Sequence, residues 1–239
     1  MIIAILSDIH ANLEALEAVV ADARSEGAGR FACLGDVVGY NADPVACIDL
    51  VRALPCRPCI RGNHDEMAAG ERALLGINSM AFTAMTWTRL QLDDERRSWL
   101  GGLPLLHEEP DAVYVHASLD DPASWHYVHD AKEAAANFAH QSRRVCFIGH
   151  SHQPGGWRDS GSSVKKGQGE SFTIADDDRW LVNVGSVGQP RDHDPRASYA
   201  LYDIEAGIVR LRRVTYDVGA AQAKILAAGL PESLAKRLD

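Results

Sequence analysis

The chain has 239 residues, of which 46% are hydrophobic, 24% charged and 7% aromatic, and its formal net charge at neutral pH is −9. This composition is typical of a globular protein and excludes a wholly disordered chain, a collagen and a low-complexity scaffold. The acidic excess argues against extended electrostatic binding to nucleic acid or to an anionic membrane, but a local positive centre remains able to bind a small phosphorylated molecule.

The first quarter of the chain alternates between short apolar runs and helical patterns. The predicted strands are Ile2–Leu6, Phe31–Leu34 and a third one that ends at Cys59-Ile60. The predicted helices between them run from Leu13 to about Gly27 and from Pro44 to about Arg52, since proline fits the first turn of a helix. This alternation predicts right-handed crossovers and a mostly parallel sheet.

Helices are predicted in the middle of the chain and strands near its end. Residues 66–100 are predicted to be helical, with one helix face made by Met80, Ala84, Trp87 and Leu90 or Gln91. Ala131–His140 predicts a further helix, and a helical tail ends the chain. The later predicted strands are Ala112–His116, Val145–Ile148, Leu181–Val184, and a hairpin of Ser198–Ile204 with Ile208–Tyr216.

Two features bear on the organisation of the later half. Asp159–Glu170 is rich in Gly, Ser and Lys, which predicts a mobile loop. The late strands predict a second sheet that is more antiparallel than the first. The sequence contains no repeat and no linker long enough to divide it, so we expect residues 1–239 to form a single domain.

The five cysteines cannot all pair, because their number is odd. Cys56 and Cys59 form a C-x-x-C motif, which is typical of a redox pair or of half a zinc site. A second pair of thiol ligands is missing, and Cys59 leads into a predicted strand end rather than a helix. We therefore interpret the cysteines as structural thiols in a reducing compartment.

The sequence shows no targeting segment. Met1–Leu6 is apolar but lacks a basic region before it and is too short for a signal core. No apolar run approaches the roughly 20 residues that span a bilayer. We therefore expect a soluble, cytoplasmic protein.

Polar residues of metal-binding types follow the predicted strands in order along the chain. They are Asp8, His10, Asp36, Asn63, His116, His150 and His152. Ligands of open α/β sheets bind beyond the carboxyl ends of the strands. Alternate residues of an extended segment point the same way, so we expect Asp8 and His10 to face one point, and His150 and His152 likewise.

The donor atoms are carboxylate oxygen, amide oxygen and imidazole nitrogen, without a thiolate. This set suits Mn²⁺, Fe²⁺, Zn²⁺ or Ni²⁺. Seven residues are too many for one tetrahedral ion and enough for two if a carboxylate bridges. Each residue alone has another explanation: Asp8 as a helix N-cap, Asp36 as a turn residue, a histidine as a hydrogen-bonded group. Their order at successive strand ends favours a metal centre. Gly35–Gly39 does not predict a phosphate-binding P-loop, because no Gly-Lys-Ser/Thr follows it.

Five motifs resemble the signature of the calcineurin-like metallophosphoesterase superfamily. They are Asp8-Ile9-His10, Gly35-Asp36, Gly62-Asn63-His64-Asp65, His116 and Gly149-His150-Ser151-His152. Asn183–Arg191 also resembles the loop that closes the site in the small prokaryotic phosphodiesterase-like members. The resemblance implies an α/β fold (α+β in some schemes), a sandwich of two mixed β-sheets flanked by helices with the metals at one end.

The same resemblance implies a site with two divalent metal ions, Mn, Fe, Zn or Ni. It implies that one ion is held by Asp8, His10 and His152, the other by Asn63, His116 and His150, and that Asp36 bridges the two. His64 is similar to a histidine of the family that is not a ligand but contacts the phosphoryl group and protonates the leaving oxygen. A hydroxide between the ions is the implied nucleophile.

Two further residues are predicted to bind substrate. Arg191 follows a glycine-rich turn, and its guanidinium can bind phosphoryl oxygens in a bidentate way, a role for which Arg61 is the alternative. Asn12 stands just past the first motif and is predicted to hydrogen-bond substrate, with the N-cap of the following helix as the alternative.

The second motif departs from that of the superfamily's protein phosphatases. Those enzymes carry a further Asp and an Arg after Gly-Asp, whereas Val37-Val38-Gly39-Tyr40 follows here. The Asp that would pair with His64 is missing at that spacing. This favours the small phosphodiesterase-like branch and leaves the partner of His64 unassigned.

The motifs therefore predict a metal-dependent phosphoesterase that hydrolyses a small phosphodiester, a phosphomonoester or a nucleotide. One alternative is a catalytically silent binding module of the same fold, which the complete ligand set disfavours. Another is a dinucleotide polyphosphate hydrolase or a nuclease; for nucleic acid, Lys165-Lys166 is the only notable basic pair of the loop. We expect a small phosphorylated substrate and no membrane partner, and a homo-oligomer is compatible with the sequence.

Overall fold

The computed structural model describes the chain except for residues 71–73, 75–76 and 176–177, and this described part contains two six-stranded sheets. The first sheet has the order β3 (Cys56–Cys59), β2 (Ala28–Cys33), β1 (Ile2–Leu6), β11 (Ala197–Asp203), β12 (Ile208–Val214), β9 (Ser171–Thr173). The second has the order β4 (Leu106–Glu108), β5 (Ala112–Val115), β6 (Val145–Ile148), β10 (Arg179–Asn183), β7 (Gly155–Asp159), β8 (Val164–Lys166). The predicted sandwich of two mixed sheets is confirmed.

The late strands do not form a sheet of their own, contrary to the prediction. β1, β2 and β3 are parallel as predicted, but β11 pairs antiparallel with the other edge of β1, where Ile5 lies opposite Ala200. β12 continues antiparallel to β11. The physical reason is that β1 would otherwise expose an unpaired edge of a buried strand. Each sheet is therefore mixed, with β10 parallel to β6 and antiparallel to β7 in the second.

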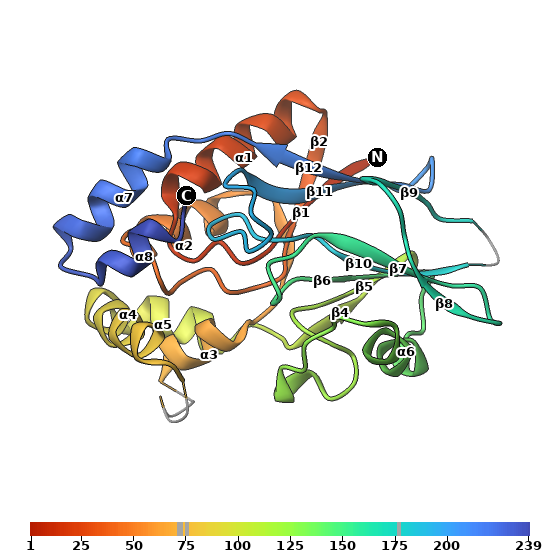
Figure 1. Ribbon diagram of the computed structural model, residues 1–239, viewed down its shortest axis with the longest axis horizontal. Coiled ribbons are helices and arrows are strands. Elements are labelled where there is room, and N and C mark those ends of the chain that lie inside the picture. The colour runs from red at the N-terminus through yellow and green to blue at the C-terminus, as the bar shows by residue number, and fades with distance from the viewer. Residues whose placement is uncertain (71–73, 75–76, 176–177) are drawn as a thin grey trace.

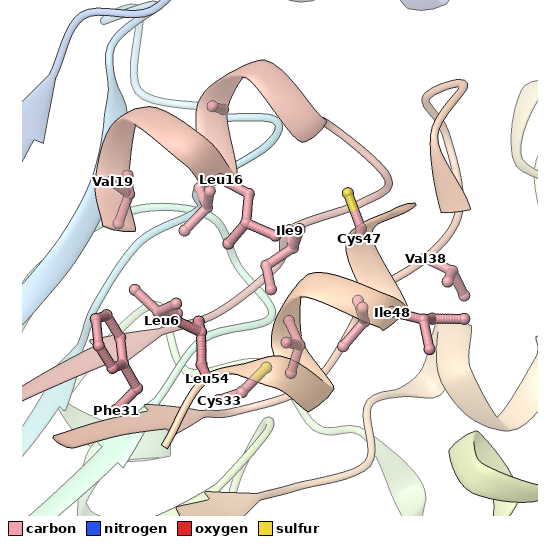
Figure 2. Packing of buried hydrophobic residues seen from close by; sticks show 14 of the residues in the cluster. Leu6, Ile9, Leu16, Val19, Phe31, Cys33, Val38, Cys47, Ile48 and Leu54 are labelled. Carbon is pink, nitrogen blue, oxygen red and sulfur yellow. The ribbon is translucent and has the colours of Figure 1, made fainter. Parts of the chain in front are cut away.

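Side-chain alternation along the strands builds two interior layers. Ile3 and Ile5 of β1 point between the sheets, where they pack with Tyr114 and Phe147 of the second sheet. Leu6 of β1 points to the other face of the first sheet and belongs to the cluster of Figure 2. The two sheets thus share one apolar layer, and the first sheet buries another one on its outer face.

Helices cover the outer faces of the sandwich (Figure 1). On the first sheet lie α1 (Leu13–Ser25) and α2 (Pro44–Ala53), whose Leu16, Val19 and Ile48 pack against the sheet, as Figure 2 shows. On the second sheet lies α6 (Ala131–His140), with Phe138 buried against Val113 and Cys146 of the strands. α2 and α6 begin where the sequence predicts them.

The middle of the chain is helical as predicted, but its buried face differs. α3 (Asn63–Ala69), α4 (Ser79–Gln91) and α5 (Asp94–Gly101) follow one another. α4 buries Ala81, Ala84, Met85 and Thr88, while Leu90 is 78% exposed, so the predicted face is wrong at its end. The tail forms α7 (Val218–Ala227) and α8 (Glu232–Lys236), and η1 (Pro122–Ser124) is a short 3₁₀ turn. None of the helices in the described ranges is long and apolar enough to cross a membrane.

The segment Asp159–Glu170 is a hairpin for most of its length and not the mobile loop predicted. β7 and β8 pair antiparallel, with Arg158 opposite Lys165 and Asp159 opposite Val164. Residues 160–163, all glycine or serine, form the turn, where the Asp159 carboxylate accepts a hydrogen bond from the Gly161 N–H at 2.8 Å, and Gly167 and Gly169 follow β8. Composition alone cannot show that the flanking residues continue a ladder.

The five cysteines all lie in the described part of the chain and none is in a disulfide. Cys56 and Cys59 face each other in β3 with their sulfur atoms 3.4 Å apart. Cys33, Cys47 and Cys146 are buried, and burial raises the pKa of the Cys47 and Cys146 thiols. The burial of Cys33, Cys47 and Cys146 agrees with the interpretation of these cysteines as structural thiols.

We predict that Ile5→Ala lowers the free energy of unfolding by about 2–5 kcal/mol, because it leaves a cavity between the sheets. Leu226→Ala is the control: Leu226 is 52% exposed on α7, and its truncation should change stability by less than about 0.5 kcal/mol. Urea denaturation followed by circular dichroism measures both. Equal losses for the two variants would contradict the placement of Ile5 in the sandwich interior.

Candidate metal centre

Loops from both sheets meet at one end of the sandwich and bring the predicted ligands together. The His, Asp and Glu residues of the described chain form three groups in which the candidate ligand atoms lie within 4.8 Å of one another. The groups are Asp8, His10 and His152; His10, Asp36 and His64; and Asp36, His116 and His150. Asn63, the seventh predicted ligand, begins α3 directly before His64, whose N–H donates to Asp36 Oδ1 at 2.8 Å.

The backbone that aims these side chains is left-handed and not extended, so the reasoning from alternating side chains is wrong. The residues with φ between 49° and 64° include Asp8, His10, Asp36, His150 and His152. Such angles are uncommon for residues other than glycine, and they cluster at functional sites. Asp8 and His10 do face one point, whereas His150 and His152 fall into different groups.

The loops after β1 and β2 run side by side beyond the strands. The Asp8 N–H donates to the Gly35 carbonyl at 3.0 Å and the His10 N–H to the Asp36 carbonyl at 2.9 Å. The fully buried Asp65 carboxylate accepts from the N–H groups of Asp36 and Gly62 at 2.7 and 3.0 Å, and from that of Val37 at 2.9 Å. Asp65 therefore ties the β2 and β3 loops together. In the sequence, Asp65 stands out only as the last residue of the Gly62-Asn63-His64-Asp65 motif, because two of its three donors are 28 and 29 residues away.

A close approach between loops explains one glycine of the motifs. The N–H of His150 donates to Asp8 Oδ2 at 2.9 Å, which brings the β6 loop onto the β1 loop. A Cβ atom on the preceding residue, Gly149, would overlap Ser7 Oγ and the Asp8 carboxylate. Only glycine lets the two loops approach this closely.

Backbone carbonyls fix the tautomer of three histidines. Nδ1 of His10, His116 and His152 faces the carbonyl oxygens of Val38, Leu34 and Gln189 at 3.1, 2.8 and 2.5 Å. Because a carbonyl oxygen only accepts, Nδ1 carries the proton and the Nε2 lone pair points into the site. Metal-binding histidines show this arrangement. No pattern in the sequence indicates this arrangement, since the carbonyls come from distant loops.

The inward-facing atoms are too electron-rich to be stable next to one another without a cation. Nε2 of His10 lies 3.1 Å from Nε2 of His152, and both nitrogens carry lone pairs. Asp8 Oδ1 lies 3.1 Å from His152 Nε2, and Asp36 Oδ2 lies 3.4 Å from His116 Nε2. A positive charge among these atoms would turn their mutual repulsion into attraction.

Unpaired buried atoms show that the residues fit such a cation. Among the described residues, Asp8 Oδ1, Asn63 Oδ1 and His116 Nε2 are buried without a hydrogen-bond partner. A buried unpaired polar atom costs about 1–3 kcal/mol, so three of them in one site are unfavourable unless something binds them. All three belong to predicted ligands, and their oxygen and nitrogen donors are those of a divalent ion.

Burial and neighbouring charges set the ionisation of the site. Burial lowers the pKa of His10 well below its ordinary value and that of His150 to about 3, which keeps both rings neutral. Burial opposes the ionisation of Asp8 and Asp36, but the imidazoles beside them hold both pKa values below the ordinary range. For His116, burial is outweighed by the Asp36 carboxylate, which raises the pKa to about 9. A metal ion would replace the proton on His116.

His64 is held by packing rather than by an acid. Its Nδ1 is buried, and no residue of the described chain hydrogen-bonds it. The His64 ring packs against those of His10 and Tyr40, with centroids 4.8 and 4.6 Å away. A Cβ on Gly39 would be 2.5 Å from Nδ1, so main chain covers this edge. Burial lowers the pKa of His64. The sequence did not predict that Tyr40 packs against this ring.

The predicted phosphate-binding arginines point in different directions. The N–H of Arg191 donates to the His152 carbonyl at 3.2 Å, and its guanidinium carbon lies 5.8 Å from the centroid of Tyr40, which packs on His64. Arg61 donates through Nη1 to the Gly101 carbonyl at 2.8 Å, at the end of α5. Arg191 is thus the arginine that lies beside the site.

Both the oxygen and the nitrogen of the Asn12 amide form hydrogen bonds within the fold. Its Oδ1 accepts from the Ala15 N–H at 3.1 Å, which caps α1, and its Nδ2 donates to the Gly188 carbonyl at 3.0 Å. Asn12 is only 1% exposed. A substrate contact for Asn12 stays a prediction, while the alternative, the N-cap, is what the structure contains.

Comparisons with known proteins point to one family. Residues 1–207 match the model of the calcineurin-like phosphoesterase superfamily domain. An uncharacterized protein of Methanocaldococcus jannaschii is 37% identical in an alignment 241 residues long, which covers 99% of this chain and 96% of the relative. The crystal structure of a metallophosphoesterase from Sphaerobacter thermophilus is 40% identical, with a TM-score of 0.87 over 100% of this chain and 98% of that one. A hypothetical protein from Pyrococcus horikoshii has the same fold, with 21% identity and a TM-score of 0.80 over 99% of this chain and 97% of that one.

We predict that Asp65→Asn lowers the free energy of unfolding by about 1–3 kcal/mol, because its NH₂ group would face one of the three N–H donors. Asp130→Asn is the matched control: Asp130 caps α6 through one oxygen, which asparagine supplies equally well. Urea denaturation in excess chelator measures both without a contribution from metal. An Asp65→Asn variant as stable as the control would contradict the role of this carboxylate.

Proposed function

This chain belongs to the calcineurin-like phosphoesterase superfamily, and we propose that it hydrolyses a small phosphodiester, phosphomonoester or nucleotide with the help of two divalent metal ions. Membership of the family makes the chain a phosphoester hydrolase; the number of ions and the size of the substrate are our proposal. The observation that carries it is the contact of His10 Nε2 with His152 Nε2 at 3.1 Å, since both nitrogens present lone pairs.

The proposed ligands divide between two ions. One ion is assigned to Asp8, His10 and His152, which form one of the three groups, and the other to Asn63, His116 and His150. Asp36 is assigned as the bridge. Two of the groups contain it, and its Oδ2 lies 3.6 Å from His10 Nε2 and 3.4 Å from His116 Nε2.

In the proposed mechanism, the bound ions would supply Lewis acidity that makes water a nucleophile at neutral pH and neutralises phosphoryl charge. The side chains of the site orient the substrate and donate hydrogen bonds to it. With Nδ1 of His64 buried and unpaired in the described chain, the proton of the neutral ring belongs on Nε2. We propose that this N–H donates to a phosphoryl or leaving oxygen and that Arg191, which like His64 lies against Tyr40, binds a second oxygen.

We predict metal-dependent turnover of bis(p-nitrophenyl) phosphate by the purified protein. Activity should disappear in chelator, return with Mn²⁺, and be absent in Asp36→Ala, which removes the proposed bridge. Asp49→Ala, a change at an exposed ion pair with Arg96, is the control that should retain activity. The proposal fails if the Mn²⁺-loaded protein exceeds Asp36→Ala on no diester, monoester or dinucleotide polyphosphate.

We predict that His64→Ala lowers kcat by about 10²–10³-fold, because it removes a hydrogen-bond donor to the reacting oxygens. The metal content, measured by elemental mass spectrometry, should stay near that of the unchanged protein, since His64 is not among the proposed ligands. His107→Ala, at an exposed histidine of β4, is the control. Loss of both metals from His64→Ala would instead make His64 a ligand, which its place in a group with His10 and Asp36 allows.

A further inference from the structure

A groove lined by aromatic side chains lies on the loop between β5 and α6. Trp125, His126, Tyr127 and His129 line it, together with residues from the start of α6. We call this surface the aromatic groove. None of the residues that line this groove is a proposed metal ligand, and neither His64 nor Arg191 is among them.

Two of these residues connect the aromatic groove to the metal centre. The Tyr127 ring stacks on His150 with centroids 4.1 Å apart and planes 20° apart. The Trp125 ring meets His116 edge to face, with centroids 5.8 Å apart. His150 and His116 are proposed ligands of the same ion, so the groove begins where that ion would lie.

The aromatic groove offers both a stacking surface and an unused hydrogen-bond donor. Tyr127 is 45% exposed, and His129 stacks on it with centroids 5.2 Å apart and planes 15° apart. Trp125 is only 7% exposed, and its indole N–H has no hydrogen-bond partner in the described part of the chain. The indole nitrogen itself is buried, so an acceptor atom would satisfy this N–H where the ligand reaches below the surface of the groove.

The charges of the aromatic groove exclude a second phosphate there. Its wall includes Asp120 and Glu133. The Glu133 carboxylate accepts the N–H groups of His129 and Asp130 at 2.6 and 3.3 Å, and Asp120 lies 3.8 Å from His126 Nδ1. Carboxylates repel an anion but accept hydrogen bonds from amino groups. The groove therefore suits a neutral planar ring that carries both donors and acceptors.

We propose that the aromatic groove binds a nucleobase of the substrate while the phosphoryl group lies at the metal centre. This inference rests on the proposed function and narrows its substrate class to nucleotides and their esters. Nucleobases have flat faces that stack on aromatic side chains, and their ring nitrogens, carbonyls and amino groups match the free indole N–H and the acidic wall.

The test compares two ligands that differ only in the base. Calorimetry with the Mn²⁺-loaded protein measures the dissociation constants of adenosine 5′-monophosphate and ribose 5-phosphate. We expect the nucleotide to bind about 10-fold more tightly, in line with the stacking of one base on aromatic side chains. Phenyl phosphate against methyl phosphate forms a second pair, and a smaller preference there separates a nucleobase site from a site for any aryl group.

Three variants locate the site. Tyr127→Ala and His129→Ala should reduce the preference for the nucleotide to about 2-fold or less and leave the affinity for ribose 5-phosphate unchanged. His129 contacts Tyr127 and none of the proposed ligand rings, so its variant guards against a disturbed metal site, and the metal content is measured for each protein. Phe82→Ala is the matched control, because Phe82 is 49% exposed, as Tyr127 is 45% exposed, but lies on α4.

Equal affinities for the two ligands in the unchanged protein would overturn the inference. A preference that survives in both groove variants would also overturn it, because the base would then bind elsewhere. A preference for phenyl over methyl phosphate as large as that for the nucleotide would overturn the assignment to a nucleobase. If the preference is present but no phosphoester is hydrolysed, the proposed function fails and this inference stands.

Discussion

Three hydrogen bonds from imidazole Nδ1 to main-chain carbonyls determine the chemistry of this protein. They turn the Nε2 lone pairs of His10, His116 and His152 toward one another and toward two ionised carboxylates. Without these carbonyls, each ring could rotate or change tautomer and satisfy itself locally. With them, the centre is a cavity of electron pairs that only a cation or a proton stabilises, and the raised pKa of His116 shows the proton in that role.

The arrangement of the two sheets brings these carbonyls within hydrogen-bond distance of the histidines. Leu34 and Val38 follow β2, while Gln189 lies in the loop between β10 and β11, so both sheets must bring their strand ends to one place. Left-handed backbone at the site residues costs energy, and the buried contacts of Asp65 and the close passage at Gly149 hold it. Strain at the centre is therefore supported by the surrounding loops.

Local patterns in the sequence were enough to predict several helices and strands and the types of residue in the site. Ile2–Leu6, Ala131–His140 and Val145–Ile148 are elements with the predicted bounds, since buried strands and capped helices carry their own signals. The partner of β11, the β7–β8 hairpin and the N–H donors to Asp65 depend on pairing between distant segments, which periodicity does not encode. Likewise, nothing local indicates that Tyr40 packs on His64 in place of an acid.

The net charge of −9 would be unevenly distributed over the protein once ions are bound in the site. Asp8 and Asp36 together contribute two negative charges, so two divalent ions would leave about two positive charges there. The metal centre would then attract phosphate although the protein as a whole is acidic. Because the neighbouring aromatic groove is bordered by Asp120 and Glu133, a long polyanion would be repelled just beyond that centre. A single phosphoryl group joined to a neutral base satisfies both conditions, and a nucleic acid strand does not.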